Sequence, residues 1–184
     1  AGNILGKKAF RIFLTINGCL APLLIGTAVG TFFTGSDFIV DKNAVGDIGA
    51  PVISRWANSW HGLEAVANHF NVEFGLMVMF LAVSLGALYM INNIEDKELD
   101  ISLRRSLLIC FCGFLLMLVL VLVQLITMEG FAVDADGVVT MEKGKYIHNL
   151  IQMPVVLIMF LLGAVLLVSG VVMTLMKKEF NRGI

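Results

Sequence analysis

Long apolar runs separated by short charged segments dominate the pattern of hydrophobic and polar positions in this chain. Four of these runs contain no Asp, Glu, Lys or Arg: residues 12–36, 74–94, 106–128 and 146–176. A helix needs about 20 apolar residues to cross a hydrocarbon core, and each run reaches that length. Because backbone amides inside a bilayer must be hydrogen-bonded within the protein, runs far longer than a barrel strand predict helices.

The fourth run is longer than one span requires, and Pro154 lies near its start. Proline is tolerated in the first turn of a helix, whereas the residue before it disfavours the helical conformation. We therefore expect the fourth membrane helix at about residues 154–176, with residues 146–153 as an approach segment. The predicted fold is an all-α integral membrane protein in which residues 1–184 form a single membrane domain. Its transmembrane helices are expected at about residues 12–36, 74–94, 106–128 and 154–176.

Lys and Arg residues are unevenly distributed between the connecting segments. Those before the first run, between the second and third, and after the fourth are Lys7, Lys8, Arg11, Lys97, Arg104, Arg105, Lys177, Lys178 and Arg182. The other two connections hold only Lys42, Arg55, Lys143 and Lys145. Positively charged loops stay on the cytoplasmic side of a membrane. We therefore expect both termini of this segment to be cytoplasmic and residues 37–73 to form an outer loop.

The stretch SRWANSWHGLEAVANHFNVEFG, residues 54–75, concentrates ionisable and aromatic side chains between two apolar runs. Its apolar residues repeat at helical spacing from residue 61 onward, with polar residues on the opposite face. This pattern predicts an interfacial amphipathic helix over residues 61–73. Trp56 and Trp60 suit the headgroup level, where an apolar ring with one N–H donor is favoured. The side chains expected to be buried are Leu63, Val66, Phe70 and Phe74.

Trp60, His61 and Glu64 are the candidate binding residues of this stretch, and they allow several interpretations. They could anchor the interfacial helix, or contact a quinone or a lipid headgroup. An unpaired carboxylate near hydrocarbon is costly, so Glu64 should meet His61, a backbone amide or a headgroup. His61 and His69 are about 12 Å apart along a helix and about 80° around it, so one helix cannot direct both at one ion. We expect no metal ligand and no catalytic residue in this chain.

Composition supports a membrane protein. Of the 184 residues, 58% are hydrophobic and 15% are charged, and the mean hydropathy is +0.90; soluble proteins contain about a quarter charged residues. The net charge of -1 is spread along the chain, so we expect no nucleic acid partner. Cys19, Cys110 and Cys112 fall within apolar runs and are expected to act as small packing residues.

Two functional alternatives from other classes follow from the same pattern. A small transporter or channel module would need a polar path, yet the apolar runs contain no carboxylate or basic residue. A membrane b-type cytochrome would need histidines that face each other at depth, and none of the three lies deep in a span. Both remain alternatives at this point.

Four segments resemble subunit II of the cytochrome bd-type quinol oxidases. They are NGCLAPLLIGTAVGTFFTGSDF from Asn17, WANSWHGLEA from Trp56, LGALYMINNIED from Leu85 and ITMEGFAVDADG from Ile126. Their order and spacing extend the resemblance over nearly the whole chain. It implies a subunit of about eight membrane helices, of which these four would be the third to sixth. The chain also begins without methionine, so we expect it to be a piece of a longer polypeptide.

The resemblance also implies function, cofactors and partners. It implies a non-haem subunit of a respiratory quinol:oxygen oxidoreductase in the bacterial cytoplasmic (inner) membrane. The b-type and d-type haems are expected in the partner, the haem-bearing subunit I, and none in this chain. Membrane lipids and a quinone are further expected partners. The family's acidic residues implicated in proton supply belong to helices without a counterpart here, so no proton-channel residue is assigned.

Overall fold

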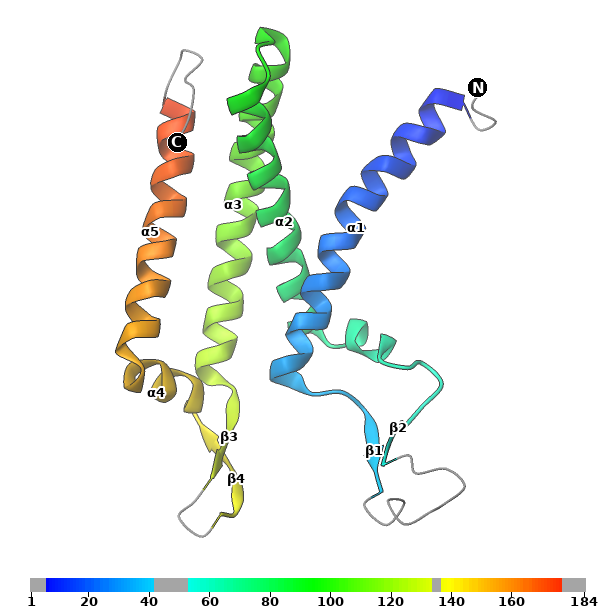
Figure 1. Ribbon diagram of the computed structural model, residues 1–184, viewed down its shortest axis with the longest axis vertical. Helices are drawn as coiled ribbons and strands as arrows, with labels where there is room; N and C mark the ends of the chain where they lie inside the picture. Colours follow the sequence, from blue (N-terminus) through cyan, green and yellow to red (C-terminus); the bar gives the residue numbers. More distant parts are fainter. Residues whose placement is uncertain (1–5, 42–52, 134–136, 177–184) are drawn as a thin grey trace. The chain divides into compact units, whose positions relative to one another are not determined.

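The computed structural model describes residues 6–41, 53–133 and 137–176. Within these residues, four helices are long and apolar enough to cross a membrane (Figure 1). They are α1 (Gly6–Thr34), α2 (His69–Asn93), α3 (Lys97–Thr127) and α5 (Pro154–Met176). The predicted all-α membrane fold is confirmed. The chain forms two compact units, Ala1–Met79 and Phe80–Ile184, whose boundary lies inside α2.

The first unit contains α1, the beginning of α2 and the segment between them. Two short antiparallel strands, β1 (Phe38–Val40) and β2 (Ser54–Trp56), pair with Phe38 opposite Trp56. A 3-10 helix, η2 (Leu63–Ala67), then leads to α2. This strand pair was not predicted from the sequence.

Small residues allow α1 and α2 to approach closely. A Cβ atom added at Gly75 would lie 2.4 Å from the Thr27 hydroxyl oxygen and 2.6 Å from the Leu23 carbonyl oxygen. A Cβ atom added at Gly26 would lie 2.8 Å from the Gly75 Cα. Contacts between small residues are the usual basis of helix association in membranes. Next to this crossing, the ring of Phe33 packs against those of Phe70 and Phe74, with ring centroids 5.9 Å apart in each pair.

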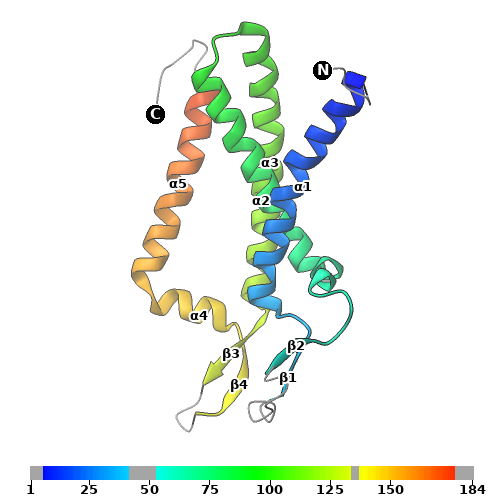
Figure 2. The same ribbon diagram turned by 45° about the vertical axis from the view of Figure 1, so that its right-hand side comes forward.

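The second unit contains the rest of α2, then α3, a hairpin, a short helix and α5. The hairpin joins β3 (Glu129–Val133) to β4 (Val139–Lys143), with Phe131 opposite Met141. The short helix α4 (Lys145–Gln152) follows and lies across the beginning of α5 (Figure 2). Apolar side chains on α3 and α5 form the core, and its buried members include Leu107, Phe111, Phe114, Val121 and Val171.

Three of the four membrane helices begin before the predicted spans. The fourth span, residues 154–176, coincides with α5. The other helices begin earlier than predicted, because a helix can continue through charged residues outside the hydrocarbon. The third helix begins after Asp96, whose carboxylate accepts hydrogen bonds from the backbone N–H groups of Glu98 and Leu99. Such an N-cap, rather than the start of the apolar run, determines where a helix begins.

The predicted amphipathic helix over residues 61–73 is wrong as a continuous element. His61 and Gly62 have left-handed backbone conformations, with φ of 49° and 94°, and Asn68 is extended. The Asn68 side chain accepts a hydrogen bond from the Phe70 backbone N–H and so caps the start of α2. Of the side chains expected to be buried, Phe70 is 2% exposed, whereas Leu63 is 63% and Val66 is 49% exposed. The approach segment 146–153 instead forms most of the additional helix α4.

Candidate functional site

A polar pocket of about 480 Å³ lies in the first unit, where α1 ends and α2 begins. Its lining combines two carboxylates with hydroxyl and amide groups. The lining residues are Thr34, Gly35, Ser36, Asp37, Glu64, Ala65, Ala67, Asn68 and Asn71. Because both helices are apolar enough to cross a membrane, we expect the pocket near the level where hydrocarbon gives way to water.

Asn71 connects three segments around the pocket. Its side chain is 1% exposed, and its Nδ2 donates to the Ala65 carbonyl in η2 at 3.1 Å. The Thr34 hydroxyl, at the end of α1, donates to Asn71 Oδ1 at 2.9 Å. A buried amide is stable only when its polar atoms are paired, and both are paired here. Asn71 therefore fixes the entry to α2 against α1 and η2.

Glu64 is the one predicted site residue that lines the pocket. Its Oε2 accepts a hydrogen bond from the Gly62 backbone N–H at 2.9 Å, which confirms a backbone amide among its expected partners. Its Oε1 is buried and has no hydrogen-bond partner. The positive φ of Gly62 brings this N–H back toward the side chain two residues later.

Trp60 and His61 are not brought together with Glu64 in the pocket. Trp60 is 66% exposed, and His61 is exposed as well. The ring of Trp56, rather than that of Trp60, lies against the turn, since a Cβ atom added at Gly62 would lie 2.9 Å from Trp56 Cη2. Asp37 and Asn71 were not predicted as pocket residues, because the backbone leaves the helical conformation between Glu64 and Asn71 and Asp37 comes from another segment.

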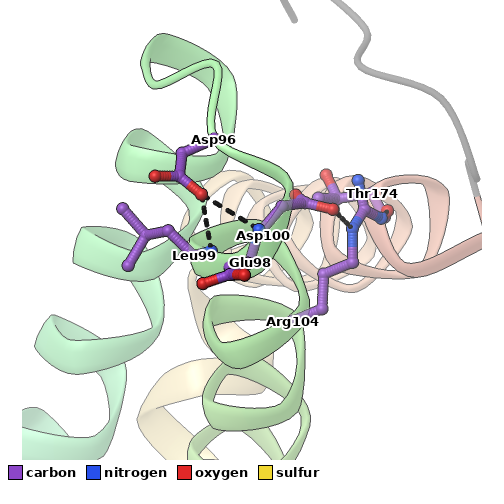
Figure 3. Close-up of polar contacts among 6 residues, drawn as sticks. All are labelled: Asp96, Glu98, Leu99, Asp100, Arg104 and Thr174. Carbon is purple, nitrogen blue, oxygen red and sulfur yellow. Dashed lines mark hydrogen bonds and ion pairs between the residues drawn. The ribbon is translucent and has the colours of Figure 1, made fainter.

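A second polar cluster joins α3 to α5 in the second unit (Figure 3). Arg104 forms a salt bridge with Asp100 at 2.7 Å, and its Nη1 donates to the Thr174 carbonyl near the end of α5. A hydrogen bond from a charged donor to a carbonyl group is stronger than one from a neutral donor. Asp100 Oδ1 is buried without a hydrogen-bond partner. This cluster stabilises the packing of α5 on α3.

Histidine, cysteine and acidic side chains do not gather into a group of three that could hold a metal ion in the described parts of the chain. His148 lies on α4, where its Nε2 is 2.9 Å from Gln152 Nε2. On the neighbouring hairpin, the hydrogen bond and the charge of Lys145 lower the pKa of the Glu142 carboxyl. These groups lie outside the four apolar helices and form local surface contacts.

Four apolar helices with polar clusters at their ends define a multi-pass α-helical membrane protein. A family model described as cytochrome bd terminal oxidase subunit II matches residues 3–182, so the chain belongs to this family. The resemblance drawn from the sequence motifs is thereby confirmed. No match was found among curated proteins or among solved structures. As a member of this family, the chain is a subunit of a respiratory quinol oxidase, an oxidoreductase complex with a partner oxidase subunit.

Proposed function

We propose that this chain is a haem-free subunit that supports assembly and stability of the haem-bearing subunit of the oxidase. The observation that carries the proposal is the packing surface left open on α5. A Cβ atom added at Gly163 or Gly170 would meet nothing within 4 Å, unlike one added at Gly26 or Gly75. Gly163 is also exposed within its unit. Small residues on an apolar helix allow another helix to approach closely, and we assign this surface to the partner subunit.

Histidine placement supports a chain without haem. His61 and His69 are exposed at the pocket end of the first unit, and His148 is exposed on α4. Haem iron held between membrane helices requires axial ligands that project from those helices at depth. We therefore assign the b-type and d-type haems to the partner and no catalytic residue to this chain.

We also propose that Trp60 and His61 contact membrane lipid or quinone at the surface of the bilayer. Their exposure next to the ends of two apolar helices supports this contact, and an indole ring favours the headgroup level. The Lys and Arg distribution supports cytoplasmic termini, and with them a position of this pocket on the outer side of a bacterial cytoplasmic membrane.

The assembly role is tested by adding a side chain to the open surface of α5. Gly163→Leu should lower the haem content per milligram of membrane protein several-fold, while quinol-driven oxygen uptake per haem stays unchanged. Val165→Leu is the matched control, because Val165 is 64% exposed on the same helix and already carries a branched side chain. Haem content of Gly163→Leu equal to that of the control would contradict the assembly role of this surface.

A further inference from the structure

The short helix α4 separates its apolar side chains from its polar ones. At about 100° per residue, the four apolar side chains fall within an arc of about 140° around the helix axis, and the four polar ones fall on the opposite side. The apolar residues are Tyr146, Ile147, Leu150 and Ile151, and the polar residues are Lys145, His148, Asn149 and Gln152. Such a division is typical of a helix that lies between an apolar medium and water.

Part of the apolar side is left open within the second unit. Tyr146 and Leu150 are half-buried, and a Cβ atom added at Gly130 of the hairpin would lie 3.3 Å from Tyr146 Cε2. Ile147 is 39% and Ile151 is 64% exposed. The helix thus packs through Tyr146 against the hairpin, whereas the described residues leave much of the two isoleucines uncovered.

The open apolar surface continues from α4 into α5. Met153, which joins the two helices, is exposed, and so are Val155 and Ile158 in the first turns of α5. Because α5 is apolar enough to cross a membrane, its first turns lie where hydrocarbon begins. Single exposed apolar residues are common on proteins, but a run that leads directly into a membrane helix indicates contact with the same medium.

The hairpin limits the depth of α4 from the other side. Its sheet has two strands, and the backbone groups along the outer edges need water, because hydrocarbon offers them no hydrogen bonds. Only Gly144 separates α4 from β4, and only Met153 separates it from α5. The helix runs across the direction of α3 and α5, and its length of about 12 Å is too short for a span (Figure 1 and Figure 2). It therefore lies at the boundary between the two media.

We propose that α4 is an interfacial helix whose Ile147 and Ile151 side chains are buried among phospholipid acyl chains, just below the headgroups. His148 and Gln152, whose Nε2 atoms are 2.9 Å apart, then face water with the other polar side chains. Lys145 lies on the same polar side and forms a salt bridge with Glu142 of the hairpin at 2.7 Å. In this arrangement α4 is an interfacial amphipathic helix, the element that was expected at residues 61–73.

The chemistry of the open side favours phospholipid over a surface of the partner subunit. Its uncovered side chains, Ile147, Ile151 and Met153, carry no N–H or O–H donor and no strong acceptor. Protein interfaces typically contain about one hydrogen bond per 100–200 Å², whereas acyl chains require only apolar contact. This inference concerns the second unit and is independent of the assembly role of α5 and of the lipid contact proposed beside the pocket.

Spin labels on adjacent residues of α4 test the proposal in the assembled oxidase. The variants Ile151→Cys and Gln152→Cys are made in a complex without other reactive cysteines, labelled with a nitroxide and reconstituted into phospholipid vesicles. Electron paramagnetic resonance then measures collisions with oxygen, which concentrates in hydrocarbon, and with a nickel chelate that stays in water. The ratio of oxygen to nickel collisions should be several-fold higher at residue 151 than at residue 152. Ile147→Cys and His148→Cys form a second matched pair and should show the same difference.

Three results would overturn the proposal. Low collision rates with both reagents at residues 147 and 151, with an immobilised nitroxide, would show that the partner subunit covers these side chains. Nickel collisions as frequent at residue 151 as at residue 152 would show that both sides of α4 face water. A loss of haem from the complex after labelling of either isoleucine would show a packed protein contact, because fluid acyl chains tolerate an apolar label.

Discussion

Gly75 shows how one residue sets the distance between two membrane helices. The Thr27 hydroxyl and the Leu23 carbonyl occupy the space that any side chain at position 75 would need. Backbone atoms of a helix cannot move aside as the end of a flexible side chain can, so the contact tolerates no added atom. Asn71, one turn earlier, depends on this spacing because it bonds to Thr34 of α1.

Adding a single methyl group at this position should therefore be destabilising. Gly75→Ala should lower the free energy of unfolding by about 1–3 kcal/mol, the usual cost of overpacking a tight site. Gly18→Ala is the control, since a Cβ atom there meets nothing within 4 Å and alanine favours a helix. Thermal denaturation of the two purified complexes measures the difference. A melting temperature for Gly75→Ala equal to that for Gly18→Ala would show that α1 and α2 are less closely packed than described.

For single residues, the sequence predicted the kind of group that a side chain contacts better than it predicted which residues lie around it. Glu64 does meet a backbone amide, as its expected burial near hydrocarbon required. Its pocket neighbours Asp37 and Asn71 were not foreseen, because they lie 27 positions before and seven positions after it in the chain. Local periodicity relates residues a few positions apart and says nothing of which turn meets which helix end.

At the scale of elements, Arg104 links the beginning of α3 to the end of α5. The guanidinium donates to Asp100 on its own helix and to the Thr174 carbonyl of α5 at the same time. The side chains of Arg104 and Asp100 are 19% and 18% exposed, so the pair is only partly screened by water. Both hydrogen bonds therefore have a charged donor and are stronger than neutral ones.

Removing this charge should loosen α5 while leaving the membrane topology unchanged. Arg104→Gln should destabilise the chain by about 1–2 kcal/mol, because Asp100 and the Thr174 carbonyl lose a charged donor. Arg105→Gln removes the same charge from the same helix at an exposed position and is the matched control. Protease sensitivity near the end of α5 measures the loosening. Equal sensitivity of the two variants would show that the Arg104 contacts do not hold α5.

Long apolar helices were predictable from the sequence, whereas short strands and broken helices were not. All four membrane helices were predicted, because an uncharged run of about 20 apolar residues is typical of a membrane-spanning helix. The strand pairs were missed, since β1 and β2 have three residues each and carry no clear alternation. The helix expected over residues 61–73 failed because its apolar spacing continues across Gly62 and Asn68, where the backbone leaves the helical conformation.

At the scale of the whole molecule, the direction of the chain across the membrane can be tested independently of its packing. We expect residues 54 and 140 on the outer side and residue 98 in the cytoplasm, because Lys and Arg gather on the side of residue 98. In a cysteine-free background, Ser54→Cys and Thr140→Cys should react with a membrane-impermeant thiol reagent in intact cells. Glu98→Cys should react only after the membrane is permeabilised. Labelling of Glu98→Cys alone in intact cells would reverse the orientation.

The identity of the complex was accessible from sequence, whereas the binding chemistry was not. Motifs such as WANSWHGLEA identified the family, and the family model confirms it over residues 3–182. A ligand pocket depends on which groups are already paired, and the side-chain oxygens of Asn71 and Asn68 acquire their partners only in the folded chain. These hydrogen bonds form only when the chain folds, so the sequence alone did not predict them.

The surface of α5 also has a consequence for the way the cell makes this protein. A helix as apolar as α5 enters the bilayer from the translocon by its own hydrophobicity, before any lateral neighbour is present. Insertion and docking are thus separate stages of biogenesis. If this surface docks on the partner as proposed, a newly inserted copy without the partner keeps its glycine surface uncovered. Synthesis of the partner, and not only translation of this chain, would then limit how much assembled complex accumulates.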